Sequence, residues 1–392
     1  MAKSLSKLWL GGLKRLIAVQ TKQTRESLKR SAARPARPIA KSSAKPSAKL
    51  RTTKTRDLPR AGARESRVRP RAAAWAGGDW TRAFHSAPVA PGRLVNHLSY
   101  GLYVPPGRAL EGLPLVVMLH GCKQSIDEFA EGTRMNLLAD RFGFAVVYPE
   151  QSKHVHAHRC WHWYDASEQA GGAEARAVVS LVDTLVTTHR FDGERVYVAG
   201  MSAGAGLASL LALLYPGRFA AVGLHSGPAM GEARSGIIAM DVMRRGTRQN
   251  PVMLVDAAVD VGAYPGMPAI IVHGDSDHVV VPENAEQLAV QFARLNGVLD
   301  ASGELRVGEV REEQKAGVMT RDYIKGGRRV VRLCRVQDLG HAWSGGDDAV
   351  PFHSSKGPDA CALLWEFFRY QRRVAEAAPA RAPLPAAAAR QA

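Results

Sequence analysis

An α/β fold with a mostly parallel central sheet is predicted by the alternation of two kinds of segment from about residue 94 onward. Short apolar runs rich in β-branched residues are separated by longer segments that carry apolar residues at helical spacing. This order is typical of parallel strands joined by crossover helices that cover both faces of the sheet, and the crossovers are expected to be right-handed. A hydrophobic content of 46% is enough for a substantial core.

The strands are predicted where β-branched or aromatic runs end at a glycine, a proline or a polar loop. In chain order these runs are residues 98–105, 113–120, 144–148, 195–199, 219–225, 269–273 and 330–336. Helices are predicted where apolar residues recur at helical spacing or where Ala and Leu accumulate before a stop such as Pro216-Gly217. They are residues 127–142, 173–189, 203–215, 236–245, 282–295 and 358–374, and residues 227–266 are otherwise irregular.

The net charge of +17 is confined to one end of the chain. Residues 1–71 hold 21 of the 53 Lys and Arg residues and 3 of the 36 Asp and Glu residues, a net charge of +18, so the rest carries −1. Rich in Ala, Ser and Pro as well, residues 1–72 are expected to be a disordered basic arm, and residues 377–392 a second disordered tail. Such an arm attracts anionic surfaces, including nucleic acid or a polymer granule, or is a solvated tail without a specific partner.

Residues 5–19 are a candidate amphipathic helix, which Gly11-Gly12 weakens. Lys14 and Arg15 interrupt its apolar stretch, leaving it too short for a secretory signal and far too short to span a bilayer. No other run could span one, so no transmembrane segment is expected. The cytoplasm is the expected location, with a granule surface as a site of attachment.

The motif Gly200-Met-Ser-Ala-Gly204 fits G-x-S-x-G, the strand–turn–helix that presents a nucleophilic serine in one class of hydrolases. A β-branched run precedes it and an Ala/Leu-rich helix follows it, which is the setting the motif requires. The flanking glycines remove side chains that would collide at the sharp bend, so the hydroxyl of Ser202 stands exposed. The competing interpretation is an ordinary serine at a helix N-cap.

A nucleophilic serine needs a histidine to take its proton and a carboxylate to orient that histidine. In this fold class the acid and then the histidine follow the serine along the chain, each on a loop after a strand. The loop after strand 269–273 offers Asp277, with Asp275 as the alternative, and either could instead stabilise a turn. The loop after strand 330–336 offers His341, beside a glycine and a tryptophan.

Two backbone N–H groups are needed to hold the oxyanion that forms during attack on an ester. The N–H of Ala203 follows the nucleophile at a helix N-terminus. The other donor is expected from the loop after an earlier strand. Strand 113–120 ends in His120-Gly-Cys122, so the N–H of Cys122 is the candidate.

With these segments in place, the chain resembles the polyhydroxybutyrate depolymerase family of α/β-hydrolase esterases, whose relatives include feruloyl and acetylxylan esterases. The matching stretches cover about residues 95–372: Leu119-His-Gly-Cys-Lys-Gln-Ser125, Met135-Asn-Leu-Leu-Ala-Asp140, Tyr148-Pro-Glu-Gln151, Arg159-Cys-Trp-His-Trp163, Gly200-Met-Ser-Ala-Gly204, His273-Gly-Asp-Ser-Asp277 and Gly340-His-Ala-Trp-Ser-Gly-Gly346. The resemblance implies one α/β-hydrolase domain over residues 94–375, with helices on both faces of its sheet.

The resemblance also implies roles for particular residues. It makes Ser202 the nucleophile, Asp277 rather than Asp275 the acid, and His341 the base, with the Cys122 amide as an oxyanion donor. The Arg-Cys-Trp segment borders the substrate cleft in the family, so Trp161, and less directly Trp343, are candidates for contact with the substrate. A disulfide between Cys122 and Cys160, both in family motifs, would brace the oxyanion loop, whereas a reducing cytosol would keep them as thiols.

The expected substrate is an oligo- or polymeric 3-hydroxyalkanoate ester, and the alternatives are a feruloyl or acetylxylan ester or, in another class, a binding protein that acts through the basic arm. No signal peptide or polymer-adsorbing domain is recognised, although secreted family members make the extracellular space the alternative location. The triad needs no cofactor. The histidines at 154, 156, 158 and 162 lack an accompanying carboxylate pattern, so no metal is expected. Cys334 and Cys361 are expected in the core.

Overall fold

The computed structural model of the protein describes residues 76–89, 96–167 and 169–373. The predicted basic arm over residues 1–72, its helix at residues 5–19 and the tail at residues 377–392 lie outside these ranges. No helix among the described residues is long and apolar enough to cross a membrane.

Ten strands of the described chain form one sheet in the order β1-β2-β4-β3-β5-β6-β7-β10-β9-β8. Its six central strands are parallel, as the alternation of strands and helices predicts, while β1, β2, β9 and β8 run antiparallel at the two edges. The strands are β1 (Asp79–Ser86), β2 (His97–Val104), β3 (Leu115–Leu119), β4 (Ala145–Glu150), β5 (Val196–Met201), β6 (Ala221–His225), β7 (Ala269–Gly274), β8 (Glu309–Lys315), β9 (Val318–Lys325) and β10 (Arg328–Val336). A separate pair is formed by β11 (Trp343–Ser344) and β12 (His353–Ser354).

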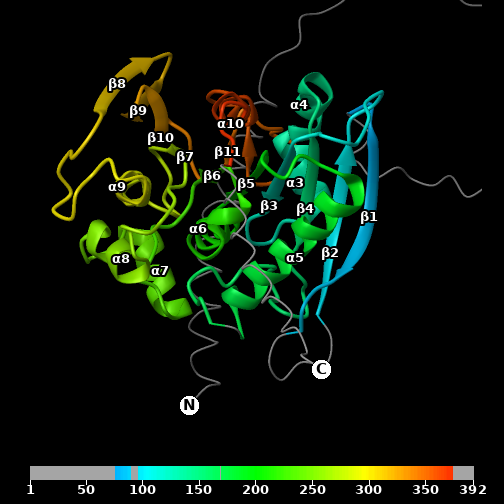
Figure 1. Cartoon of the computed structure of the whole chain (residues 1–392), viewed down its shortest axis with the longest axis horizontal. Coiled ribbons are helices and arrows are strands. Elements are labelled where there is room, and N and C mark those ends of the chain that lie inside the picture. The colour runs from blue at the N-terminus through cyan, green and yellow to red at the C-terminus, as the bar shows by residue number, and fades with distance from the viewer. Residues whose placement is uncertain (1–75, 90–95, 168, 374–392) are drawn as a thin grey trace, which may run out of the picture. The chain divides into compact units, whose positions relative to one another are not determined.

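Helices cover both faces of this sheet, and Figure 1 shows them around the central strands. Alternate residues of β3 enter two different cores: Leu115 and Val117 pack with α5, α6 and α9, whereas Val116 and Met118 pack with α3, α4 and α10. The helices are α3 (Ile126–Thr133), α4 (Met135–Phe142), α5 (Gly171–His189), α6 (Ala203–Leu214), α7 (Gly236–Arg245), α8 (Pro251–Ala258), α9 (Glu283–Leu295) and α10 (Ala360–Phe368). The predicted α/β-hydrolase architecture is therefore confirmed.

The predicted helix at residues 127–142 is two helices, because Arg134 adopts a left-handed conformation with φ of 61° and ends α3 where α4 begins. The close packing of Gly132 against the ring of His353 accompanies the break, since a Cβ built on Gly132 would lie 2.2 Å from that ring. Helix α8, inside the segment expected to be irregular, was not predicted, and α10 ends at Phe368 rather than at residue 374.

The domain begins before residue 94, which corrects the predicted boundary. Strand β1 pairs with β2 along its whole length, and Arg82 on it forms ion pairs with Asp127 and Glu150. Strands β1, β8 and β9 escape prediction because they lie toward the sheet edges. There charged side chains alternate with few apolar ones, and every residue of β8 is exposed.

Candidate active site

Ser202 occupies a strained turn between β5 and α6, where its backbone has φ of 56° and ψ of −120°. The turn requires the glycines of the motif: a Cβ on Gly200 would lie 2.4 Å from the Gly204 backbone, and one on Gly204 would lie 2.1 Å from the carbonyl oxygen of Leu119. The Ser202 side chain makes no capping hydrogen bond to α6. Ser202 thus stands at the N-cap position of α6 without the hydrogen bond of an ordinary N-cap serine, on a bend of the kind that presents a nucleophile.

The structure brings His341 to Asp277. The Nδ1–H of His341 donates to Oδ2 of Asp277 over 2.7 Å, and Oδ1 of Asp277 accepts from the N–H groups of Val279 and Val280, each over 2.9 Å. Burial by itself raises the pKa of Asp277, but the charge and hydrogen bond of His341 outweigh it, so the pKa falls to about 2. Asp277 is thus a buried, ionised acceptor at neutral pH.

Asp275, the alternative acid, has a different partner. Its Oδ1 accepts from the N–H of Asp338 over 2.8 Å and from the hydroxyl of Ser276 over 3.0 Å. The bond from Asp338 ties the loop after β7 to the loop after β10, which carries His341. Asp275 therefore holds the two loops together, and the structure pairs His341 with Asp277 instead.

The turn of Ser202 and the loop of His341 both contact one buried residue, His225, which is the last residue of β6. The N–H of Ser202 donates to the His225 carbonyl oxygen over 2.9 Å. The ring nitrogen Nε2 of His225 accepts from the N–H of Ser344 over 3.0 Å, and the ring stacks on Trp343 with centroids 4.8 Å apart. One residue thereby holds both the nucleophile turn and the loop of His341.

The loop after β3 lies against the Ser202 turn. A Cβ built on Gly121 would be 3.4 Å from both the Cβ of Ser202 and the carbonyl oxygen of Met201. Among the described residues, no hydrogen-bond acceptor is found for the N–H of Cys122 or of Ala203. These are the two donors that the sequence predicts for an oxyanion, and both remain available to a ligand.

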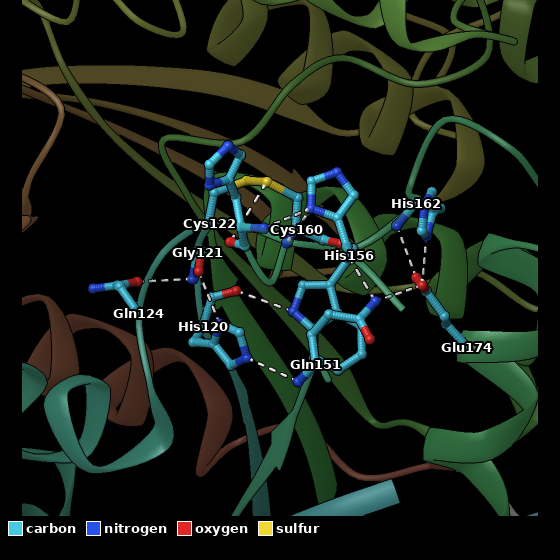
Figure 2. The surroundings of a disulfide bond; sticks show 11 residues. His120, Gly121, Cys122, Gln124, Gln151, His156, Cys160, His162 and Glu174 are labelled. Carbon is cyan, nitrogen blue, oxygen red and sulfur yellow. Dashed lines mark hydrogen bonds and ion pairs between the residues drawn. A yellow bond between two sulfur atoms is a disulfide. The ribbon is translucent and has the colours of Figure 1, made fainter. Parts of the chain in front are cut away.

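A disulfide joins Cys122 to Cys160 and connects this loop to the segment that follows β4 (Figure 2). The same two segments are joined by the bond from the N–H of Lys123 to the carbonyl oxygen of His158, 2.6 Å long. Gly121 donates its N–H to Oε1 of Gln124 over 2.8 Å, which closes the loop on itself. The oxyanion loop is therefore fixed to its neighbour by covalent and hydrogen bonds.

Both tryptophans predicted to contact substrate are almost fully buried, and their contact with substrate stays a prediction. Trp343 has no exposed surface and packs between Phe129 and His225. Trp161 is 1% exposed, and its Nε1–H donates to the His120 carbonyl oxygen over 3.1 Å. Trp343 packs beneath the loop that carries His341, whereas Trp161 lines a pocket together with His162 and Glu174.

The histidine-rich segment after β4 binds the backbone and a carboxylate. Nδ1 of His156 accepts from the N–H groups of His158 and Cys160, each over 3.2 Å, and burial lowers the pKa of His156 to about 4. His162 pairs with Glu174 over 2.7 Å. Within the part of the chain that the structure describes, no cluster of three or more His, Cys, Asp or Glu side chains could hold a metal ion.

Sequence reasoning missed three buried histidines that support the site: His120, His225 and His273. Each stands at the carboxyl end of an apolar strand, which is the signal that could have identified them. His273 donates its Nε2–H to the carbonyl oxygen of Val280 over 2.8 Å, and so holds the loop of Asp277. Burial lowers the pKa of all three, so they are neutral supports at neutral pH.

A serine on a sharp strand–helix turn and an Asp–His pair, at one edge of a sheet of this topology, are typical of the α/β-hydrolase fold class. The family model described as Esterase PHB depolymerase matches residues 98–316, more than half of the chain. The chain therefore belongs to this family. Ser202 and Asp277 lie inside the matched range, and His341 follows it.

Two relatives illustrate the likeness. The chain is 33% identical over 202 residues to poly(3-hydroxyalkanoate) depolymerase C of Paucimonas lemoignei. The match covers 50% of this chain and 48% of that protein. The chain is 28% identical over 209 residues to a probable acetylxylan esterase A of Neosartorya fischeri, covering 50% of this chain and 55% of the relative. The chain thus spans about half the length of the curated relatives it matches.

The solved structure of an acetyl xylan esterase from Aspergillus awamori superposes with a TM-score of 0.57 at 20% identity. The match covers 74% of this chain and 99% of that one. At this identity the likeness shows the fold alone.

Proposed function

We propose that the protein hydrolyses carboxylic esters through an acyl-enzyme formed on Ser202. The observation that carries this proposal is the pairing of His341 with the buried carboxylate of Asp277 at the sheet edge where Ser202 stands on its turn. Membership of the Esterase PHB depolymerase family supports the same reaction class. Of the two relatives described above, one is named a poly(3-hydroxyalkanoate) depolymerase and the other a probable acetylxylan esterase.

In the proposed reaction, Asp277 fixes His341 with its proton on Nδ1, which leaves Nε2 to take the proton of the Ser202 hydroxyl. The serine oxygen attacks the ester carbonyl carbon, and the N–H groups of Cys122 and Ala203 bind the oxyanion. Protonated His341 then gives its proton to the departing alcohol. Water, activated by His341, attacks the acyl-enzyme and releases the acid.

The proposed substrates are 3-hydroxyalkanoate esters, as oligomers or polymer. The relative with 33% identity, named for such a polymer, supports this class. Feruloyl and acetylxylan esters are the second candidate, supported by the acetylxylan esterase of Neosartorya fischeri and by a feruloyl esterase B of Thermothelomyces thermophilus that is 29% identical over 197 residues. Rates on hydroxybutyrate oligomers, feruloyl esters and acetylated xylan, measured side by side, separate the two classes.

The test of the reaction compares two serines at the start and middle of one helix. We expect Ser202→Ala to lower kcat on a short-chain aryl ester by about 10⁴-fold or more, since the nucleophile is lost. The control is Ser209→Ala, because Ser209 is buried in α6 and its hydroxyl has no partner in the described structure. A fluorophosphonate should label the wild type and the control on the peptide containing Ser202. Full activity in Ser202→Ala would refute the proposal.

We propose an oxidising compartment as the place where this fold is assembled, rather than the cytoplasm expected from the sequence. The disulfide between Cys122 and Cys160 supports this, because cytosolic thiols are kept reduced. Binding of a granule or another anionic surface by residues 1–72 stays a prediction, since the arm lies outside the described residues.

A further inference from the structure

The peptide unit between Gly121 and Cys122 carries the proposed oxyanion donor at one end and a carbonyl oxygen at the other. A trans peptide is planar, so its C=O and N–H point in opposite directions and rotate together. The described chain contains no cis peptide bond. Whatever holds the Gly121 oxygen therefore sets the direction of the Cys122 N–H.

Two groups contact this oxygen: the N–H of Gln124 donates to it over 3.4 Å, and the imidazole of His120 lies closer. Its Nδ1 lies 2.8 Å from the Gly121 carbonyl oxygen, and its Nε2 lies 3.0 Å from the backbone nitrogen of Gln151 (Figure 2). A backbone N–H only donates, so Nε2 carries no proton. A carbonyl oxygen only accepts, so Nδ1 carries the proton and donates it. The two contacts independently require the same neutral tautomer.

The ring has little freedom to turn away from this position. His120 is fully buried at the end of β3, and its own carbonyl oxygen accepts from the Nε1–H of Trp161 over 3.1 Å. Burial is the main cause that lowers the pKa of His120 to about 4, so the ring is neutral over the range in which esterases are assayed.

The disulfide alone does not provide this control. It restrains the side chain of Cys122, whereas the peptide plane before Cys122 turns about the ψ angle of Gly121 and the φ angle of Cys122. Gly121 has no side chain to limit its ψ angle. The hydrogen bond from His120 acts on the plane itself, and it draws electron density toward the carbonyl oxygen, which makes the opposite N–H a better donor.

We propose that His120 is a positioning residue of the oxyanion site, which aims the Cys122 N–H at the reacting carbonyl by holding the Gly121 carbonyl oxygen through its Nδ1–H tautomer. The proposal rests on the proposed function, because the Cys122 N–H is assigned there as the oxyanion donor. Its test therefore follows the Ser202→Ala experiment: the His120 variants keep Ser202 and are interpreted only once Ser202→Ala is found to abolish ester hydrolysis.

The experiment uses two substitutions at one position in the full chain. His120→Leu keeps the apolar bulk but cannot donate, whereas the side-chain amide of His120→Asn can place an N–H where Nδ1 stands. We expect His120→Leu to lower kcat on the aryl ester about 10²-fold with KM within about threefold, as for a misaimed oxyanion donor. The kcat of His120→Asn should be at least about tenfold higher than the kcat of His120→Leu.

A matched control separates positioning from general loss of stability. Tyr148→Phe removes another buried hydrogen bond, from the Tyr148 hydroxyl to Oδ1 of Asn136 over 2.7 Å, in the strand next to β3 and without contact to the oxyanion loop. Its kcat should stay at the wild-type value below the melting temperature. Equal kcat for His120→Leu and His120→Asn, or a loss confined to KM, overturns the proposal.

A measurement on the wild type covers the case in which no His120 variant folds. Nitrogen-15 NMR of histidine-labelled protein at neutral pH should show one neutral ring with its proton on Nδ1 and with Nε2 coupled to the amide of Gln151. A proton on Nε2 of His120 would refute the proposal, because that tautomer cannot donate to the Gly121 oxygen. The rate of ester hydrolysis, measured on the same sample, shows separately whether the proposed function holds.

Discussion

The two oxygens of Asp277 perform separate tasks: Oδ1 accepts two backbone N–H groups of its own loop, and Oδ2 accepts the Nδ1–H of His341. The carboxylate is thus fixed before it fixes the histidine. Asp275, only two residues earlier, accepts from a backbone N–H and a hydroxyl and reaches no ring nitrogen in the described structure. The two residues are of the same type, but their carboxylates point toward different partners.

This difference gives a prediction with a built-in control. Asp277→Asn should lower kcat by about 10⁴-fold, because an amide no longer fixes the tautomer of His341 or stabilises its protonated form. Asp275→Asn keeps an oxygen that can accept from Asp338, so its kcat should stay within about threefold of the wild type. The measurement is the initial rate of aryl ester hydrolysis by both variants. A larger loss in Asp275→Asn would reverse the assignment of the acid.

At the residue scale the sequence identified side chains by type and order, but it did not identify their exposure. Ser202, Asp277 and His341 were predicted from a motif and from their positions after strands. Trp161 and Trp343 were assigned to the substrate by the same reasoning, yet both are buried. An aromatic residue beside a catalytic loop can either pack beneath the loop or contact the substrate. Only the packing in the folded structure distinguishes the two roles.

At the scale of elements, the loop after β3 and the segment after β4 act as one unit. The disulfide joins positions 38 residues apart, and closing a loop of this length restricts the unfolded chain. Three hydrogen bonds connect the same two segments: Trp161 to His120, Gln151 to His120, and Lys123 to His158. The disulfide therefore stabilises a contact that is also made without it.

We expect the double substitution Cys122→Ala with Cys160→Ala to lower the free energy of unfolding by about 3 kcal/mol, measured by urea denaturation. Treatment with a reductant should destabilise the wild type by a similar amount and leave the double variant unchanged. Thiol titration of denatured, unreduced protein should find two thiols, those of Cys334 and Cys361. Four titrated thiols would contradict the disulfide.

Most central elements could be predicted because their strands are buried on both faces and are mostly apolar. Every residue of β3, β4, β5, β6 and β7 is buried. The edge strands are different: the composition of β8 is that of a solvated segment, and its pairing with β9 depends on the backbone. Local sequence carries little information about such pairing, because the backbone hydrogen bonds of a strand can be made with any extended neighbouring segment.

Across the whole molecule, β1 shows where the domain starts. Trp80 on this strand packs over Gly101 of β2, where a Cβ would lie 2.5 Å from the indole, and its ring centroid is 5.4 Å from that of Tyr148 on β4. Phe84 on the same strand is 76% exposed. The first strand thus adds an apolar contact that reaches across two neighbouring strands.

We expect Trp80→Ala in the full chain to lower the free energy of unfolding by about 3 kcal/mol, because it removes a large ring from a packed contact. Phe84→Ala should change it by less than about 0.5 kcal/mol, since its ring already lies in water. Urea denaturation of both variants makes the comparison. Equal stabilities would show that the domain starts after β1, as the sequence predicted.

The sequence by itself determined the class of fold and the three residues of the proposed triad, because buried strands and a glycine-flanked serine leave local patterns. The tertiary structure alone decided which partners the two oxygens of Asp277 accept from, which aromatic rings are hidden, and which atoms hold the Gly121–Cys122 peptide. These outcomes depend on the directions of groups brought together from distant parts of the chain, and hydrogen bonds and packing fix such directions only after the sheet has formed.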